Sequence, residues 1–201
     1  MPLTLRNLRD ARLVLASASP RRATLLGQLG LTPLVDPSRN PEHVPPGITP
    51  EDLVTRLASD KAREVMVRHP GADLVLGADT VVVLDGQILG KPCDAADAGR
   101  MLTALAGRWH AVYTGIALFA VPSGQSVVAH VQSEVFMRPL APEEISAYIA
   151  TGEPLDKAGA YAIQGLGGVF VREIRGDYQN IVGLPLARLD AAWRELGWRL
   201  L

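Results

Sequence analysis

The stretch Leu-Val-Leu-Ala-Ser-Ala-Ser-Pro-Arg-Arg, residues 13–22, passes from an apolar strand pattern directly into the start of a helix. Pro20 suits the first helical position, because its φ is already helical and the amide that it lacks would be unpaired there. Ser19 is expected to cap this helix, since a Ser hydroxyl accepts a free amide of the first turn. The stretch therefore predicts a strand followed at once by a helix, as in an α/β protein.

Four polar residues make this helix start a candidate seat for an oligophosphate: Ser17, Ser19, Arg21 and Arg22. The free amides and the dipole at a helix N-terminus favour an anion. Two arginines in the first turn oppose the positive end of the dipole, so their placement is unfavourable unless an anion neutralises it. The alternative is an ordinary helix start whose arginines reach into water.

Length and composition favour one domain over residues 1–201. The 20 basic and 21 acidic side chains nearly cancel, which argues against a nucleic-acid partner or a membrane surface.

We find no apolar stretch near the roughly 18 residues of a membrane span, and the first ten residues lack a signal-peptide core. Cytoplasmic residence is the expectation, and a single cysteine, Cys93, is compatible with a reducing compartment.

Apolar periodicity predicts most of the remaining elements. Helices are expected over about 49–66, 94–105, 142–150 and 185–196, and strands over 74–84, 110–121, 126–137 and 169–174. Thr49 is expected to cap the first of these helices. The Pro-rich segment 32–48 is a predicted loop, and the nearly continuous apolar run 74–84 is typical of a strand buried on both faces.

Asp79 interrupts this apolar run, where a carboxylate costs several kcal/mol unless a cation or a metal compensates its charge. A positive group should therefore face it. Where the strand emerges into a cleft, Asp79 could bind Mg²⁺ or Mn²⁺, which prefer oxygen ligands, or accept a proton from an attacking water. Glu42 is the candidate for a second carboxylate near the metal. The alternative is a carboxylate at a strand end that caps a neighbouring loop.

The chain has 17 arginines and only three lysines, Lys61, Lys91 and Lys157. Lys61 and Lys157 both lie in the tripeptide Asp-Lys-Ala, and Lys91 follows a predicted hairpin. A lysine ammonium is a compact point charge suited to one phosphate oxygen, whereas arginine presents a planar fork. The three lysines are therefore candidate phosphate ligands, the alternative being compositional drift.

Other chemistries lack their signatures. His43, His69, His110 and His130 show no zinc-ligand spacing. The sequence contains no Gly-x-Ser-x-Gly elbow, no Walker motif and no Gly-x-Gly-x-x-Gly after a strand. These absences disfavour a zinc enzyme, a serine hydrolase, a P-loop ATPase and a dinucleotide oxidoreductase.

Short motifs follow one another along nearly the whole chain. They are Ser-Ala-Ser-Pro-Arg-Arg at 17–22, Asp-Lys-Ala at 60–62, Gly-Ala-Asp-Thr-Val-Val at 77–82, Gly-Lys-Pro at 90–92, His110 with Thr114-Gly115, Gly-Glu-Pro at 152–154 through Gly-Ala-Tyr at 159–161, Ile-Gln-Gly at 163–165 and Gly-Leu-Pro-Leu at 183–186. In these motifs the chain resembles the Maf family of nucleoside triphosphate pyrophosphatases. Ser133 and Asp177 depart from the Thr and Ser that the family often has there, which puts local hydrogen bonds in doubt.

The resemblance implies an α/β fold with a central mixed, twisted sheet flanked by helices, two lobes around a nucleotide cleft, a divalent cation and a homodimer. It also implies cleavage between the α and β phosphates, which releases a nucleoside monophosphate and pyrophosphate. Asp79 would be the proton acceptor, and Arg21, Arg22, Lys61 and Lys91 would hold phosphate, which makes Asp79, Lys61 and Lys91 the catalytic set. The metal would be held by the two carboxylates already named as candidates, Glu42 and Asp79. Substrate binding would fall to Ser17, Ser19, Arg21, Arg22, Thr80, Lys157 and Gln164.

Within the family, the Asp-Lys-Ala-Gly form at 156–159 and the Ile-Gln-Gly form at 163–165 resemble the branch that acts on dTTP and UTP. Arg21, Thr80 and Gln164 would influence the choice of base. The Gln164 amide offers a donor and an acceptor that can meet the O4 and N3-H edge of uracil or thymine. Two alternatives stay open: a 7-methylguanosine triphosphate pyrophosphatase, and a nucleotide-binding regulator of septum formation without useful turnover.

Overall fold

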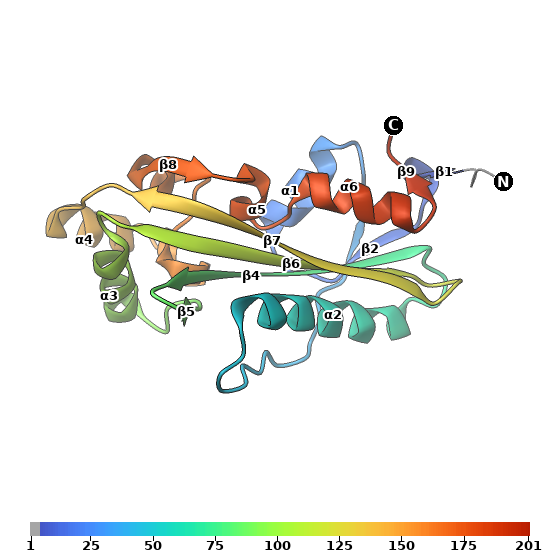
Figure 1. The fold of residues 1–201 in the computed structure, drawn as a ribbon, viewed down its shortest axis with the longest axis horizontal. Helices are drawn as coiled ribbons and strands as arrows, with labels where there is room; N and C mark the ends of the chain where they lie inside the picture. The colour runs from blue at the N-terminus through green and yellow to red at the C-terminus, as the bar shows by residue number, and fades with distance from the viewer. Residues whose placement is uncertain (1–4) are drawn as a thin grey trace. The chain divides into compact units, whose positions relative to one another are not determined.

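The computed structural model describes residues 5–201, in which helices flank a mixed β-sheet (Figure 1). The larger sheet has seven strands in the order β3-β2-β4-β6-β7-β8, with β5 paired to β4. Strand β2 pairs in parallel with both β3 and β4, whereas β4 with β5 and β7 with β8 are antiparallel pairs. The expected α/β class with a central mixed sheet is confirmed.

The elements follow one another from a short N-terminal strand to a short C-terminal one, and these two strands pair in parallel. The strands are β1 (Arg6–Asn7), β2 (Leu13–Leu15), β3 (Leu34–Val35), β4 (Leu74–Leu84), β5 (Gln87–Leu89), β6 (Trp109–Ala120), β7 (Gln125–Met137), β8 (Val171–Arg175) and β9 (Trp198–Arg199). The α-helices are α1 (Pro20–Gln28), α2 (Pro50–Arg68), α3 (Ala95–Leu105), α4 (Pro142–Ala150), α5 (Tyr178–Val182) and α6 (Leu186–Glu195). The 3₁₀ helices are η1 (Leu8–Asp10), η2 (Glu153–Asp156), η3 (Ala158–Ala160) and η4 (Leu166–Phe170).

Most predicted elements are confirmed within one or two residues, but two segments differ. The predicted loop 32–48 contains β3, whose two residues pair with Val14 and Leu15. Two residues are too few for periodicity to reveal a strand. The predicted strand 169–174 begins only at Val171, because the glycine-rich stretch before it coils into η4. No helix within residues 5–201 has the length and the apolar character that crossing a membrane requires.

The chain clusters into two compact units, and the single domain expected from its length stays a prediction. The first unit comprises the chain through Asp79 together with Thr114–Val131 and Gly183–Leu201. In this unit α2 covers one face of the strands, and α1 and α6 lie on the other (Figure 1). The core between α2 and the strands is made of mostly small buried residues: Val14, Ala16, Ala58, Ala62, Val65, Ala72, Val75, Ala117 and Phe119.

Two glycines let α2 approach the sheet closely. A Cβ at Gly77 would lie 2.0 Å from the carbonyl oxygen of Ala58, and one at Gly115 would lie 2.3 Å from that of Val54. Both distances are far below van der Waals contact, so only glycine fits at these positions. The same face of β4 carries the residue two positions after Gly77, and this residue is Asp79. The close approach therefore brings α2 beside the buried carboxylate.

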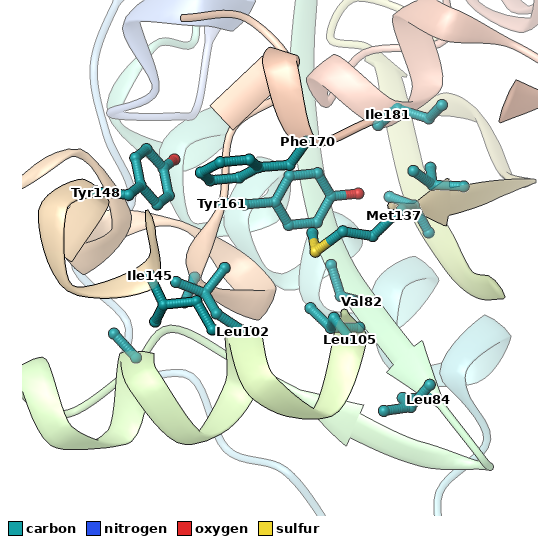
Figure 2. Close-up of a cluster of buried hydrophobic side chains, with 14 residues drawn as sticks. Val82, Leu84, Leu102, Leu105, Met137, Ile145, Tyr148, Tyr161, Phe170 and Ile181 are labelled. Carbon is teal, nitrogen blue, oxygen red and sulfur yellow. The ribbon is translucent and has the colours of Figure 1, made fainter. Parts of the chain in front are cut away.

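The second unit comprises Thr80–Tyr113 and Gln132–Val182, and its core is rich in aromatic rings (Figure 2). The rings of Tyr148 and Phe170 meet edge to face, with centroids 5.0 Å apart. Leu102 and Leu105 of α3 are fully buried in the same cluster, and each such side chain contributes about 1.5–3 kcal/mol to stability. Ile163 packs against this core, which therefore supports the segment of Gln164, a residue predicted to contact the base.

The two departures from the family's motifs, Ser133 and Asp177, lie in direct contact within this unit. The Ser133 hydroxyl accepts the amide of Asp177 at 3.0 Å and the side-chain amide of Asn180 at 2.9 Å. Asn180 also donates to the carbonyl of Val112 at 3.0 Å. The local hydrogen bonds that these departures put in doubt are therefore made with the residues present.

Candidate functional site

Asp79 lies in the middle of β4 rather than at a strand end, and only 7% of the residue is exposed. Lys61, on the α2 face turned toward β4, places its Nζ 2.5 Å from the Asp79 carboxylate. The prediction that a positive group faces this acid is confirmed. The alternative of a loop-capping carboxylate at a strand end is wrong, because the apolar strand continues for five residues past Asp79.

Burial changes the acidity of this carboxyl group. It raises the pKa of Asp79, and the positive charges of Lys61 and Arg22 act in the opposite direction without cancelling the effect. The negative charge of Glu42 adds to the increase. Asp79 therefore takes up a proton at a higher pH than an exposed aspartate would, which suits a proton acceptor.

Glu42 and Asp79 converge on the same ammonium group. The Lys61 Nζ lies 2.7 Å from a Glu42 carboxylate oxygen as well as 2.5 Å from Asp79. These are the oxygen donors that Mg²⁺ and Mn²⁺ prefer, and Mg²⁺ typically binds one or two carboxylates while keeping water and phosphate ligands. The donor set fits the divalent cation that the family resemblance implies. Within residues 5–201, no group of three or more His, Cys, Asp and Glu side chains is arranged to hold a metal.

The loop that carries Glu42 is tied to α2 on both sides of this residue. The Arg68 guanidinium donates to Asp36 at 3.0 Å and to the carbonyl of Pro37 at 2.9 Å. Arg56 donates to the carbonyl of His43. These contacts place the half-exposed Glu42 carboxylate over Lys61 without help from regular secondary structure.

At the start of α1 the hydrogen bonds differ from the prediction. Ser19 occupies the N-cap position, but among residues 5–201 its side chain makes no capping hydrogen bond, so the expected cap is wrong. The Ser17 hydroxyl instead accepts the Ser19 amide at 3.3 Å and the Arg22 guanidinium at 2.8 Å. The turn into the helix is therefore held by the hydroxyl two residues earlier, which Arg22 orients.

Arg22 is buried, with 8% of the residue exposed, so the alternative in which both arginines reach into water is wrong for it. Its Nε donates to the carbonyl of Gly183 at 2.8 Å, and its charge acts on the nearby Asp79. The unfavourable placement of Arg22 near the helix N-terminus is thus compensated within the chain. Arg21 is half-buried beside it and stays a predicted phosphate ligand.

The predicted site residues of the second unit lie on connected segments. The Gly159 amide donates to the carbonyl of Gly90 at 3.0 Å, which ties the segment of Lys157 to that of Lys91. Gly159 has a φ of 67°, and a Cβ there would lie within 3.0 Å of Val82. Only glycine satisfies both conditions.

Their side chains differ in exposure. Lys91 is exposed, whereas the Lys157 side chain is 13% exposed and pairs with Asp156. Thr80 and Gln164 are half-buried. The structure therefore gathers Ser17, Arg22, Glu42, Lys61 and Asp79 in the first unit, and it holds Thr80, Lys91, Lys157 and Gln164 in the second.

Comparison with known proteins identifies the family. The family described as Maf-like protein matches residues 12–196. The chain belongs to the Maf family. It is 54% identical over 191 residues to the dTTP/UTP pyrophosphatase of Anaeromyxobacter dehalogenans (strain 2CP-C), covering 94% of this chain and 96% of the relative. It is 53% identical over 180 residues to the dTTP/UTP pyrophosphatase of Moorella thermoacetica, covering 90% and 92%.

Two Maf motifs contain residues for which sequence reasoning predicted no role. Gly183, in the motif at 183–186, supplies the carbonyl that accepts a hydrogen bond from Arg22. Glu153, in the motif at 152–154, accepts hydrogen bonds from the backbone amides of Leu166 and Gly167. The motifs themselves were the signal, but the partners are distant in sequence and no local pattern indicates them.

Proposed function

We propose that this Maf family protein is a nucleoside triphosphate pyrophosphatase that hydrolyses dTTP and UTP, and modified pyrimidine nucleotides of the same kind, to the monophosphate and pyrophosphate. Relatives about half identical over nine tenths of the chain bear the name dTTP/UTP pyrophosphatase. The observation that carries the proposal is the buried Asp79 carboxylate in contact with Lys61, which also contacts Glu42. A site for binding alone would not need an acid whose pKa is raised by burial.

In this reaction water attacks the α phosphorus and pyrophosphate leaves. Asp79 accepts the proton of the attacking water, and its raised pKa makes it a better base than an exposed aspartate. Lys61 keeps the Asp79 carboxylate oriented and places a positive charge beside the reacting group. A divalent cation held by Glu42 and Asp79 would neutralise phosphate charge and polarise the scissile bond.

Phosphate binding is assigned to cationic and hydroxyl groups from several segments. Arg21 and the hydroxyls of Ser17 and Ser19 serve at the start of α1, where the helix dipole also favours an anion. Arg22 acts in the same place, oriented by Ser17 and Gly183. Lys91 and Lys157, which lie in the second unit, are also assigned to phosphate, as point charges for its oxygens.

Base selection is assigned to Gln164, together with Arg21 and Thr80. A glutamine amide can donate to O4 and accept from N3-H of uracil or thymine. Cytosine presents a donor and an acceptor in the reverse order, so the same amide orientation opposes it. A homodimer remains a prediction from the family resemblance, and a cytoplasmic location remains a prediction from the sequence.

The test is a substrate panel containing dTTP, UTP, CTP, ATP, GTP and 7-methylguanosine triphosphate, with Mg²⁺ or Mn²⁺. We expect pyrophosphate release, fastest with dTTP and UTP. Release of orthophosphate would contradict the assigned cleavage site, and a preference for 7-methylguanosine triphosphate would select that alternative. Nucleotide binding without metal-stimulated hydrolysis would instead favour a regulator that binds nucleotides.

A further inference from the structure

The segment that carries Gln164 is held on both sides by two side chains from elsewhere in the second unit. The Glu153 carboxylate accepts the amides of Leu166 at 3.1 Å and Gly167 at 3.0 Å. The Tyr148 hydroxyl accepts the amide of Ala162 at 3.2 Å. Backbone positions two residues before and two residues after Gln164 are thus attached to side chains outside the segment.

Glu153 and Tyr148 are joined to one another, and we call this pair the clamp. The Tyr148 hydroxyl donates to the Glu153 carboxylate at 2.8 Å. Burial raises the pKa of Glu153, but the amide of Gly167, the Tyr148 hydroxyl and the amide of Leu166 outweigh burial and leave the pKa lowered. Burial and the hydrogen bond to Glu153 raise the pKa of Tyr148. The carboxylate is therefore an acceptor only, and the phenol keeps its proton as the donor.

The backbone of the segment is shaped to the clamp. A Cβ at Gly165, whose φ is 108°, would lie 2.6 Å from a Glu153 carboxylate oxygen. A Cβ at Gly167 would lie 2.6 Å from the Tyr148 hydroxyl oxygen. The segment can wrap around these two side chains only because it has no side chain of its own at either position.

The clamp rests on a rigid support. Tyr148 is 4% exposed and packs edge to face on Phe170 in the aromatic core, as Figure 2 shows. Its ring cannot change rotamer without opening this core. The position of the Tyr148 hydroxyl, and through it that of Glu153, is thus set by packing and not by the segment that it holds.

We propose that Glu153 and Tyr148 are positioning residues for base selection, which hold the backbone of residues 162–167 so that the Gln164 amide presents its donor and acceptor in one place. This inference rests on the proposed function, in which Gln164 reads the pyrimidine edge. Discrimination by hydrogen bonds is large only when the protein groups are held in position, and a displacement of about 1 Å can cost roughly 100-fold. The clamp is the structural feature that holds them.

The test compares UTP with CTP in Glu153→Gln. The glutamine amide turns one acceptor into a donor facing a donor, so at least one hydrogen bond of the clamp is lost. We expect kcat/KM for UTP to fall about 10- to 100-fold, mainly through KM, while kcat/KM for CTP stays within about twofold. A merely structural role would lower both values together. Glu143→Gln, on the exposed face of α4 in the same unit, is the matched control.

A second variant removes the hydroxyl and keeps the ring. Tyr148→Phe retains the packing on Phe170 and should reproduce the loss of UTP over CTP selectivity, whereas Tyr178→Phe, at an exposed tyrosine, should not. Hydrogen exchange of the Leu166 and Gly167 amides should accelerate in Glu153→Gln. If both clamp variants keep the wild-type ratio of UTP to CTP, or lose both substrates equally, the proposal is wrong.

Gln164→Ala separates this proposal from the proposed function. If Gln164 reads the base through the clamp, Gln164→Ala lowers the UTP to CTP ratio, and adding Glu153→Gln lowers it no further. If Gln164→Ala leaves the ratio unchanged, the assignment of base selection to Gln164 fails. If it lowers the ratio and the clamp variants do not, only the clamp proposal fails.

Discussion

Two carboxylates, one in each unit, have opposite environments. Asp79 is deeply buried, it is contacted by the Lys61 ammonium, and its pKa is raised. Glu153 is less buried, it accepts two backbone amides and one hydroxyl, and its pKa is lowered. Hydrogen bonds to the ionised form outweigh desolvation for Glu153, whereas desolvation prevails for Asp79.

This difference separates two uses of an acidic residue. A carboxylate whose oxygens are occupied by backbone donors is fixed in place and holds structure. A carboxylate that is buried with less compensation can exchange a proton or bind a cation. The apolar run around Asp79 marks this residue in the sequence as an acid that needs compensation, whereas no local pattern indicates what Glu153 does. Only its hydrogen-bond partners in the structure assign Glu153 a positioning role.

The units also differ in the charge state of the basic side chain that each one buries. The first unit buries a charged Arg22 guanidinium against a carbonyl, a hydroxyl and the charge of Asp79. The second unit buries His110, whose Nε2 lies 2.7 Å from the Tyr161 hydroxyl. Burial lowers the pKa of His110 to about 4, so this imidazole is neutral near pH 7. The first unit thus buries a charged side chain next to Asp79, and the second buries a neutral one.

The largest expected effect concerns Asp79 itself. Asp79→Asn removes the proton acceptor while keeping the shape of the side chain, and we expect turnover of UTP to fall by about 10²- to 10⁴-fold. Pyrophosphate release measures the loss, and circular dichroism checks the fold. Asp190→Asn, the same change on an exposed ion pair of α6, is the control. Wild-type turnover in Asp79→Asn would show that Asp79 is not the proton acceptor, and the contrast with Glu153 would then fail.

The contrast between neighbouring arginines gives the next largest effect. Arg22→Met leaves Ser17 and Gly183 without their donor and Asp79 without one compensating charge, so the free energy of unfolding should fall by about 3–5 kcal/mol. Arg21→Met, at a half-buried position, should change it by about 0.5 kcal/mol or less, while weakening the substrate complex by about 1.5–3 kcal/mol. Denaturant titration and KM measure the two quantities. Equal loss of stability in both variants would contradict the distinction.

The smallest effect tests whether the buried His110 imidazole of the second unit is neutral. Because the pKa of His110 is about 4 in the folded protein and near 6.5 in the unfolded chain, the unfolded state binds more protons between these values. The free energy of unfolding should therefore fall as the pH drops from 6.5 to 4, by roughly 3 kcal/mol. His110→Gln should flatten the pH dependence by that amount in denaturant titrations, and His130→Gln on the exposed face of β7 is the control. An unchanged slope in His110→Gln would mean that His110 is not buried neutral.

Two similar helix starts show how far sequence reasoning reaches. Thr49 before Pro50 caps α2 as predicted, with its hydroxyl accepting the Asp52 amide at 3.2 Å. Ser19 before Pro20 has the same local pattern but does not cap α1. There the Ser17 hydroxyl is held by the buried Arg22, which depends on Gly183, 161 residues further along the chain. The local pattern is sufficient only where no distant group competes.

The amino-acid sequence by itself determined the succession of the longer strands and helices, the membership of the Maf family and the need for a cation beside Asp79, because periodicity, short motifs and the cost of burying a charge can be recognised locally along the chain. Only the tertiary structure decided that Lys61 supplies this cation, that Arg22 is buried and that Glu153 holds the segment of Gln164. Each of these depends on which groups packing brings together, and side-chain hydrogen bonds are chosen by that proximity rather than by position along the chain.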